Sequence, residues 1–492
     1  MAAVYTLPMI KVPTTEQLRT LRRFLDAQSY DTDSLNEQLG QSKPPAPGQA
    51  QQMFDESREI TTQNVLIRLF LLGTTIDEAT VREFLPDSVI AILGDHGFLS
   101  IDAGMAEPRV VIIPVDDLLF VSDAFHALGG PGASEFVLPA STHSANLLRL
   151  TTLRDPVDRV LDLGCGCGIL ALFAARHAKH VVATDISEPA IRYTQINAGL
   201  NGFDNVECRL GSVFEPVAGE SFDLIVSNPP FVIGPSDHFE YRDNQLQLDE
   251  FCRILVREAP LHLNDSGHLQ MLCEWVEIAN EPWRQRVEAW VSGLGCDAWV
   301  LHSAPRSPSS YVEQRTSDIS GDGVAAGAAT REWIRYFDEH DVHAIHPGLL
   351  VLRKRTGNNW LHFQNLPADV VVEAGGAVAR QIAACDFLEV CGDDGSLLEA
   401  NLGLADALAA YQQGEDDPNG PTIVLQLTDG LSMDAEIAGT VAAFINFFNG
   451  ERTVGECITE FSKATSASAE QLAPDLLSIV RTFVLRGFLE PV

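Results

Sequence analysis

The sequence predicts an α/β fold built around a mostly parallel β-sheet with helices on both faces. Two observations support this prediction. Short apolar runs alternate with helical segments between about residues 133 and 356, and a glycine-rich turn follows the first of these runs. Such alternation is typical of doubly wound sheets, in which crossover helices join successive strands. The segments on either side have different patterns, so we expect flanking domains at both ends.

Bulk composition limits the classes of protein to which the chain can belong. Its 492 residues favour two to four domains, and 46% apolar residues are enough to build their cores. The formal charge is -35, with 68 Asp plus Glu against 33 Lys plus Arg, and no basic stretch is visible. Such a surface repels phosphate backbones and anionic lipids, although a solvated acidic face without a specific partner explains the charge more simply.

Cysteine usage and the N-terminal residues indicate the compartment. Nine cysteines, with no paired spacing beyond Cys165 and Cys167, do not form the pattern of a disulfide framework. The first residues lack a basic region followed by a long apolar run, and no stretch of about 18 uncharged apolar residues occurs. We therefore expect a soluble, cytoplasmic protein.

Residues 1–125 are predicted to form a mostly helical, winged-helix-like domain. Apolar residues recur at helical spacing after Thr14, and similar patterns cover residues 61–72 and 78–85. A further helix from about Val89 leads into an alternating segment, residues 110–122, which is typical of a hairpin that turns near residues 116 and 117.

Residues 126–356 are predicted to form the α/β domain. Residues 303–328, rich in Ser, Gly and Pro, are expected to be a loop, followed by a helix over residues 330–339. The seven candidate strands cover residues 160–163, 181–185, 206–210, 224–227, 268–273, 297–301 and 349–353.

Residues 357–492 are predicted to form an acidic α+β domain that ends in a second winged-helix-like unit. They contain 20 Asp plus Glu against 5 Lys plus Arg. Helical patterns cover residues 454–461 and 473–485, and the segment Arg-Gly-Phe-Leu at 486–489 repeats the His-Gly-Phe-Leu at 96–99. Two related caps explain this repeat, and coincidence between two short apolar motifs is the alternative.

The first chemical motif is a turn with three glycines at one-residue spacing, Gly164, Gly166 and Gly168, after an apolar strand that contains Asp162. Glycine lets the backbone turn sharply and approach a ligand closely. Dinucleotide-binding enzymes use a related turn, so the glycines alone do not identify the ligand. Asp185, at the end of the next strand, can accept hydrogen bonds from both hydroxyls of an unphosphorylated ribose.

The second motif is the turn Asn228-Pro229-Pro230-Phe231, which follows a strand at the carboxyl edge of the sheet, where open α/β folds bind ligands. The Asn228 side-chain oxygen and the Pro229 carbonyl can each accept one hydrogen of a planar NH2 group. The prolines stiffen the turn, and Phe231 can stack on a flat amide or base. Taken alone the motif also fits an ordinary tight turn; its spacing from the first motif favours catalysis.

The chain from about Val160 to Phe231 resembles the class I S-adenosylmethionine-dependent methyltransferases, and the second motif resembles the N/D-P-P-Y/F motif of their amino-methylating branch. That branch includes HemK/PrmC-type glutamine methyltransferases of release factors and N-methyltransferases of rRNA or DNA bases. The resemblance implies a Rossmann-like, seven-stranded sheet and S-adenosyl-L-methionine as the cofactor.

The resemblance also implies site residues. It assigns catalysis to Asn228, Pro229, Pro230 and Phe231. It assigns cofactor binding to Asp162, Gly164, Gly166, Gly168, Asp185, Ile186, Ser212, Val213 and Asn228.

Substrate binding is assigned to Phe231, Tyr241 and Arg242; the last two lie in a loop that follows the second motif, and a solvated loop is the alternative. Many relatives carry an Asp at the position of Ser212, whose hydroxyl can still bind the adenine ring. Relatives also use the segment 136–148 to cover the methionine end of the cofactor, although Ser141, Thr142 and His143 could simply cap the following helix.

No metal is expected. Cys165 and Cys167 occupy variable positions of the glycine turn, and two thiols alone cannot complete a zinc site.

The favoured hypothesis is methylation of a glutamine side-chain amide in a protein such as a translation release factor. The second is methylation of an exocyclic amine of rRNA or DNA, for which Arg19, Arg22, Arg23 and Arg68 could form a local basic patch. The lack of a basic stripe favours the first hypothesis. A small-molecule acceptor and a regulator that binds the cofactor without turnover are further alternatives, and the intact Asn228 turn argues against the regulator. No membrane partner is expected.

Overall fold

The computed structural model describes residues 10–42, 50–124, 135–140, 157–235, 246–316, 323–366, 375–413, 422–429 and 434–492. These residues form two compact units. Unit 1 comprises the described residues up to Gln364, and unit 2 comprises those from Asn365 onward. The predicted three-domain division at residues 125 and 356 stays a prediction.

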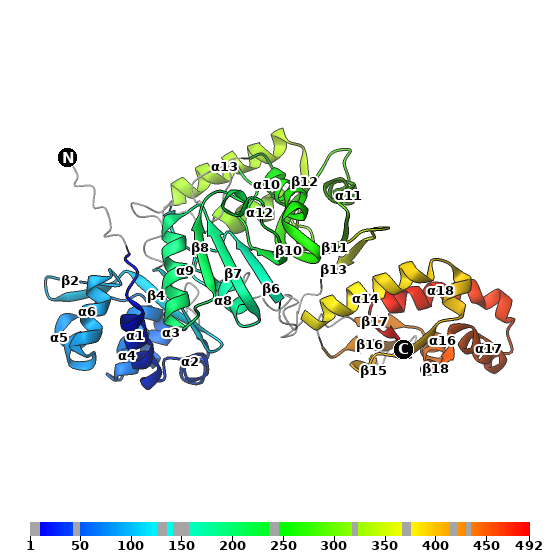
Figure 1. The fold of residues 1–492 in the computed structure, drawn as a ribbon, viewed down its shortest axis with the longest axis horizontal. Helices are drawn as coiled ribbons and strands as arrows, with labels where there is room; N and C mark the ends of the chain where they lie inside the picture. The colour runs from blue at the N-terminus through cyan, green and yellow to red at the C-terminus, as the bar shows by residue number, and fades with distance from the viewer. Residues whose placement is uncertain are drawn as a thin grey trace. The chain divides into compact units, whose positions relative to one another are not determined.

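An eight-stranded β-sheet forms the centre of unit 1 (Figure 1), with the strand order β13-β11-β12-β10-β9-β6-β7-β8. The five neighbouring strands β8, β7, β6, β9 and β10 are parallel to one another. Strand β12 runs antiparallel to both β10 and β11. The bounds are β6 Val157–Leu163, β7 Ala178–Asp185, β8 Val206–Leu210, β9 Phe222–Ser227, β10 Leu263–Ile278, β11 Cys296–His302, β12 Val342–Lys354 and β13 Leu361–Asn365.

Helices cover both faces of this sheet. Successive side chains of a strand point to opposite faces, and the buried residues on each face pack against helices. In β6, Leu161 and Leu163 join an apolar cluster with side chains of α10 and α11, whereas Asp162 turns to the opposite face and meets α8. The helices are α8 Ile169–Ala175, α9 Glu188–Leu200, α10 Glu250–Glu258, α11 Trp283–Val291, α12 Pro308–Thr316 and α13 Gly323–Glu339, with 3-10 turns at Glu215–Val217 and Ala259–His262.

The α/β class and all seven predicted strands are confirmed, but the sheet has one strand more than predicted. The eighth strand, β13, lies at the edge and pairs only with β11. Its sequence, Leu-His-Phe-Gln-Asn, is short and contains two apolar residues. A strand of this kind is stabilised by a partner far away in the sequence, which local patterning does not reveal.

The prediction of a loop over residues 303–328 was wrong in part, because α12 and the start of α13 lie there. The serines that suggested a loop act at the start of α12, where the Ser307 hydroxyl accepts a hydrogen bond from the Ser310 amide. The helix then buries Tyr311 and Val312, both 0% exposed. Only these two positions carry the apolar signal, which is too short for periodicity to indicate a helix.

The N-terminal part of unit 1 combines helices with a small antiparallel sheet of order β1-β3-β2, and its winged-helix-like character stays a prediction. The predicted hairpin is present as β4 and β5, which turn at residues 116 and 117. The elements are α1 Thr15–Ala27, α2 Thr32–Leu39, α3 Ala50–Glu56, α4 Thr62–Leu66, the π-helix Ile67–Leu71, β1 Ile76–Asp77, α5 Glu78–Phe84, α6 Asp87–Asp95, β2 Leu99–Asp102, β3 Met105–Pro108, β4 Val110–Val115 and β5 Leu118–Asp123.

Asn197 of α9 and Asn201, which follows the last residue of this helix, attach this part to the central sheet. The Asn197 side-chain amide bonds both the N–H and the carbonyl of Val121 (2.8 and 2.9 Å), and Asn201 bonds those of Leu119 (2.9 and 2.8 Å). Four residues of helix rise about 6 Å and two residues of strand about 6.6 Å, so the two amides match alternate residues of β5. Asn197 also donates to the carbonyl of Cys167 in the glycine turn, at 2.8 Å.

Unit 2 has two three-stranded antiparallel sheets, of order β18-β14-β19 and β15-β16-β17, around a separate apolar core. Its elements are α14 Gly375–Cys391, α15 Asp394–Leu398, β14 Asn401–Leu404, β15 Leu408–Gln413, β16 Thr422–Leu427, β17 Asp434–Ile437, α16 Gly439–Ile445, β18 Asn449–Thr453, α17 Val454–Thr465, α18 Ala469–Leu485 and β19 Leu489–Pro491.

The repeated Gly-Phe-Leu segments adopt the same local structure in both units. Gly97 and Gly487 have φ values of 81° and 73°, so each closes its helix in the left-handed conformation. The next residues, Phe98 and Phe488, are fully buried, and each amide donates to the carbonyl five residues earlier. Each segment thus joins a helix to a strand in the same way, and the two related caps stay a prediction.

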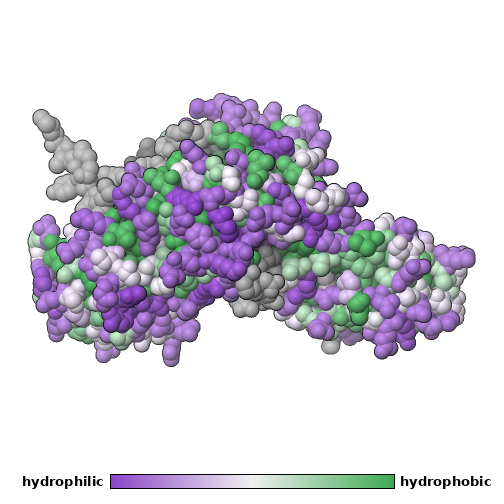
Figure 2. Space-filling view, viewed as in Figure 1, coloured by the Kyte–Doolittle hydropathy of each residue, from purple (hydrophilic) through white to green (hydrophobic). Residues whose placement is uncertain are grey.

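The visible surface is mostly hydrophilic (Figure 2), and the cysteines form no disulfides. Hydrophilic side chains cover most of the face seen in Figure 2, and apolar residues occur there in small separate areas. All nine cysteines are free thiols. None of the described helices has the length and apolar character needed to cross a membrane.

Asn197→Ala tests the attachment of β5. The change leaves both backbone groups of Val121 and the carbonyl of Cys167 without this partner inside the protein. We expect the free energy of unfolding to fall by roughly 1–3 kcal/mol, the cost of an unsatisfied buried polar group. Urea denaturation measures it, and Asn358→Ala, on an exposed loop, serves as the control with an expected change within about 0.5 kcal/mol. Equal stability of the two variants would contradict the assigned role.

Candidate active site

The glycine turn joins β6 to α8. Gly164, Gly166 and Gly168 have φ values of 77°, 55° and 82°, a region that side-chain-bearing residues rarely adopt. The amides of Gly164 and Cys165 both donate to the carbonyl of Thr184 in β7, at 2.9 Å. A Cβ on Gly168 would lie 2.8 Å from the side chain of Thr194. The three glycines are therefore required by backbone conformation and, at position 168, by close packing against α9.

Asp162 lies beneath this turn. It is fully buried, and its Oδ2 accepts a hydrogen bond from the Ala171 amide at 2.9 Å. Its Oδ1 has no hydrogen-bond partner within the described part of the chain. Burial raises the pKa of this carboxyl to about 7, although the bond from Ala171 lowers it, and the negative charge of Asp185 adds a smaller upward effect. Asp162 thus holds α8 against β6 from below the turn.

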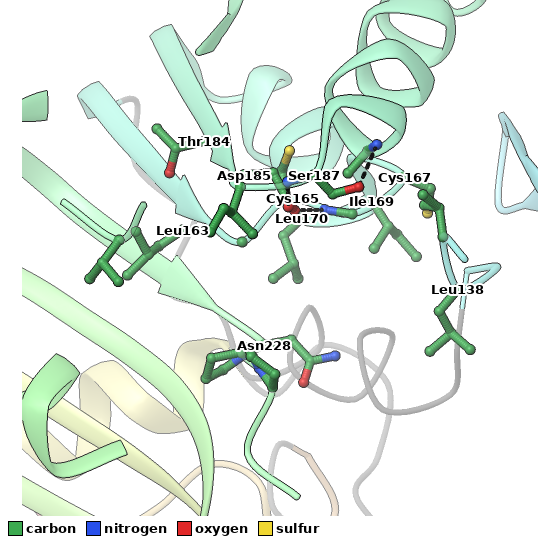
Figure 3. Close-up of a pocket in the computed structure, with 18 of the residues that line it drawn as sticks. Leu138, Leu163, Cys165, Cys167, Ile169, Leu170, Thr184, Asp185, Ser187 and Asn228 are labelled. Atoms are coloured by element: carbon green, nitrogen blue, oxygen red, sulfur yellow. Dashed lines mark hydrogen bonds between the residues drawn. The ribbon is translucent and has the colours of Figure 1, made fainter. Parts of the chain in front are cut away.

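Asp185 ends β7 beside the turn. Its Oδ2 accepts a hydrogen bond from the Gly166 amide and its Oδ1 one from the Ser187 amide, both at 2.9 Å (Figure 3). Burial raises the pKa of Asp185, and these backbone bonds oppose the shift. Because each carboxylate oxygen has two lone pairs, both oxygens can accept one further hydrogen bond.

The strand pairing brings the second motif to the same edge of the sheet. Leu163, the last residue of β6, is paired with Ser227, the last residue of β9, and the Ser227 hydroxyl donates to the Leu163 carbonyl at 2.7 Å. Each turn begins one residue later. In Figure 3 the Asn228 side chain lies across the cavity from Asp185 and Leu170.

A cavity of about 470 Å³ opens between these two turns. Drug-sized ligands occupy sites of this scale. Its wall consists of Glu135, Phe136, Val137, Leu138, Pro139, Leu163, Gly164, Cys165, Gly166, Cys167, Ile169, Leu170, Thr184, Asp185, Ile186, Ser187, Ala190, Gly211, Ser212, Val213, Asn228, Pro229, Pro230, Phe251 and Leu255.

Most of the predicted site residues meet at this cavity: Gly164, Gly166, Asp185, Ile186, Ser212, Val213, Asn228, Pro229 and Pro230 all line it. Asp162 and Gly168 do not; they support the turn from behind. Phe231 does not line the cavity either, and it packs against apolar clusters on the two faces of the sheet. Its predicted stacking on an acceptor stays a prediction.

Several predicted positions lie outside the described residues: Tyr241, Arg242, Ser141, Thr142 and His143. The first part of the segment expected to cover the cofactor is described, and its residues 136–139 line the cavity.

Other wall residues were not predicted. Ser187, Phe251 and Leu255 carry no motif, and only the fold brings α10 to the cavity. Asp123, at the end of β5, was also missed. Its carboxylate accepts hydrogen bonds from the Val137 amide at 2.8 Å and from the Tyr193 hydroxyl at 2.5 Å. It therefore fixes the segment 136–139 to α9, which a scan for local motifs does not detect.

The two thiols of the turn are buried. Burial raises the pKa of Cys167 to about 12, and it also raises the pKa of Cys165 well above its usual value, so both thiols remain protonated at neutral pH. Thr194 also donates to the Cys165 sulfur at 3.3 Å. Protonated thiols are poor metal ligands, and no cluster of three His, Cys, Asp or Glu residues suited to a metal occurs among the residues that the structure describes.

Residues 142–276 match the family model of the methyltransferase small domain. This segment therefore matches a methyltransferase small domain, which confirms the resemblance to methyltransferases indicated by the two turns. Two curated relatives, both methyltransferases, align with this part of the chain.

Ribosomal RNA small subunit methyltransferase C of Cronobacter sakazakii is 35% identical over 130 residues, which are 26% of this chain and 34% of that protein. Release factor glutamine methyltransferase of Xylella fastidiosa is 38% identical over 130 residues, 24% of this chain and 47% of that protein. The chain thus spans between about a third and a half of these relatives. Among solved structures, a ribosomal protein L11 methylase from Lactobacillus delbrueckii subsp. bulgaricus is 20% identical, with 44% of this chain and 81% of that chain covered and a TM-score of 0.26.

The pKa of Asp162 predicts a pH dependence of stability. The Asp162 carboxyl has a pKa of about 7 in the folded protein and near 3.9 in the unfolded chain, so the folded protein binds the carboxyl proton more tightly. The contribution of Asp162 to stability is therefore greatest at low pH, and it falls as pH rises from about 4 to about 7. Asp162→Asn lacks this group. The free energy of unfolding of the wild type minus that of the variant should fall by on the order of a few kcal/mol over this interval and stay constant above it. A constant difference in urea denaturation from pH 4 to 7 would contradict a raised pKa.

Proposed function

We propose that this protein is an S-adenosylmethionine-dependent N-methyltransferase that methylates a planar nitrogen, and that the nitrogen belongs to a glutamine side chain of a protein such as a translation release factor. The observation that supports the reaction is the single cavity that has the glycine turn and Asp185 on one side and the Asn228 turn on the other.

The wall residues fit the cofactor. Asp185 can accept hydrogen bonds from the ribose hydroxyls, and Ile186, whose side chain is 65% exposed here, offers an apolar surface for the adenine. The glycines let the backbone approach the methionine part closely. Bound there, S-adenosylmethionine would supply an electrophilic methyl group on its sulfonium sulfur; the acceptor nitrogen would take this methyl group in exchange for a proton lost to water, and the sulfur would keep the electron pair of the broken bond.

Asn228 and Pro229 orient the acceptor. The Asn228 side-chain oxygen and the Pro229 carbonyl each accept one N–H of the NH2 group, which directs its lone pair into the cavity. The prolines restrict the turn, so little further ordering is needed when the acceptor binds. Positioning of this kind accounts for a rate gain worth several kcal/mol, since it converts an encounter in solution into a reaction between fixed groups.

Charge supports a protein acceptor. The chain has a formal charge of -35, and α6, the helix before β2, carries Asp87 and Asp95 and no Lys or Arg. If the predicted winged-helix-like arrangement placed this helix in a DNA groove, its carboxylates would repel the phosphates.

Two observations favour an RNA acceptor as the second candidate. One relative methylates ribosomal RNA according to its name. Arg19, Arg22, Arg23 and Arg176 line one hollow at the N-terminal part of unit 1.

These arginines are close to acids, however, since Glu16 pairs with Arg19 and Arg23, Asp26 with Arg22, and Asp117 with Arg176. Arg68, which was predicted to belong to the same patch, donates instead to the Ser57 carbonyl at 2.5 Å and lies over the ring of Phe54. The hollow is therefore close to neutral, which argues for the protein acceptor.

Asp185→Ala should weaken cofactor binding. The variant loses the acceptor for the ribose hydroxyls, so we expect the dissociation constant for S-adenosylmethionine to rise at least about tenfold, or 1.4 kcal/mol. Isothermal titration calorimetry measures this change. Glu188→Ala removes a carboxylate three residues away that does not line the cavity, and it should leave the constant unchanged. Unaltered affinity in Asp185→Ala would mean that the ribose is held elsewhere.

Asn228→Ala should remove most turnover and leave cofactor affinity nearly unchanged. The test uses radiolabelled methyl donor with purified, unmethylated release factor, and in parallel with ribosomal RNA. We expect label in the protein, and a loss of about 100-fold or more in kcat for the variant. Label in the RNA alone would establish the second candidate. Full activity of Asn228→Ala would refute the role of this residue with either acceptor.

A further inference from the structure

The helices α12 and α13 lie outside the segment that matches the methyltransferase small domain, yet one of their side chains reaches the Asn228 turn. The Ile233 amide donates a hydrogen bond to the Tyr311 hydroxyl oxygen at 3.1 Å. Ile233 comes two residues after the end of the motif Asn228–Phe231, and both Ile233 and Tyr311 are buried. The contact therefore fixes the backbone at the exit of the turn.

The Tyr311 hydroxyl is itself held in place. It donates to the carboxylate of Glu274 in β10, which also accepts a hydrogen bond from Arg315 at 2.9 Å. The Arg315 guanidinium lies over the Tyr311 ring, 5.2 Å from its centroid. The side chains of Glu274 and Arg315 are 2% and 14% exposed. Burial strengthens these contacts. Because Glu274 binds the hydroxyl of Tyr311 and Arg315 lies over its ring, the hydroxyl has little freedom to move.

Packing restrains the same backbone from its other side. A Cβ on Gly234 would lie 2.7 Å from the ring of Trp333 in α13, so the backbone lies directly on that ring. Val232 and Ile233 belong to one apolar cluster with Tyr311 and Trp333, and Phe231 packs against it. The exit of the turn is thus enclosed between the sheet and the two helices.

We propose that Tyr311 is a positioning residue for methyl transfer: through the Ile233 amide it sets the place of the Asn228-Pro229-Pro230-Phe231 turn relative to the glycine turn. This inference rests on the proposed function. Its physical basis is that the donor is bound mainly by β6, β7 and the glycine turn, whereas the acceptor is oriented by the end of β9. A displacement of about 1 Å between them costs about 100-fold in rate.

A buried tyrosine can also serve stability alone, and Tyr30 provides the matched control. It is 0% exposed like Tyr311, and its hydroxyl donates to the Ile112 carbonyl at 2.8 Å in the N-terminal part of unit 1. Tyr30→Phe deletes one buried hydrogen bond to the backbone, whereas Tyr311→Phe deletes the bond from the Ile233 amide and also the bond to Glu274. Both variants should lower the melting temperature, and Tyr311→Phe should lower it at least as much.

The test compares the full-length wild type, Tyr311→Phe and Tyr30→Phe. Hydrogen exchange of the peptide segment 228–235 reports the order of the turn without any acceptor. Calorimetry with S-adenosylmethionine reports the cofactor site, and kcat and KM are measured with purified, unmethylated release factor. We expect Tyr311→Phe alone to exchange faster at this segment and to lose about 10-fold to 100-fold in kcat, with KM and cofactor affinity changed less than about threefold.

The outcomes separate the two proposals. Unchanged exchange at 228–235 in Tyr311→Phe overturns the positioning role, whatever the activity. Wild-type kcat in Tyr311→Phe, or an equal loss of kcat in Tyr30→Phe, also overturns it while the proposed function stands. If the wild type binds the donor but labels neither release factor nor RNA, the proposed function fails, and the role of Tyr311 in transfer fails with it.

Discussion

The parallel pairing of β6 with β9 is the constraint on which the site depends. It sets Leu163 opposite Ser227, so that the glycine turn and the Asn228 turn both begin one residue beyond the same edge of the sheet. The Ser227 hydroxyl bonds the Leu163 carbonyl at 2.7 Å and fixes the register where the strands end. A shift of one residue would send every side chain of β9 to the opposite face, so the apolar residues of the two faces protect this register.

The N-terminal part of unit 1 is joined to the same edge by polar contacts rather than by apolar packing alone. Asn197 bonds Val121 of β5 and also Cys167 of the glycine turn, and Asp123 at the end of β5 bonds the amide of Val137 in the cavity wall. Buried networks of this kind specify one arrangement, since a displaced partner leaves unsatisfied groups behind. The N-terminal part therefore contributes to the shape of the cavity, although the matched family segment begins only at residue 142.

The sequence predicted what is encoded locally. β6, β7 and β9 contain short apolar runs, and Gly164, Gly166 and Gly168 have the backbone conformation that glycine favours, so both features were found without structural data. What it did not predict depends on distant partners. β13 is stabilised by β11, α12 is hidden by the serines at its start, and Asn197 resembles any helical asparagine until β5 is placed beside it. The same holds for Tyr311, whose proposed role depends on the hydrogen bond from the Ile233 amide to its hydroxyl.

The cavity is acidic, and its charge affects which ligand it binds. Its described wall includes Glu135 and Asp185 and no Lys or Arg, and Asp162 lies buried beneath it. An interior carboxylate is poorly solvated, so a cation nearby stabilises its ionised form and is itself attracted. Such a site favours a ligand that carries a sulfonium over the same ligand after the positive charge at sulfur is lost. In the proposed reaction, transfer of the methyl group removes that charge, so the buried acids that lower stability at neutral pH would also favour donor binding and product release.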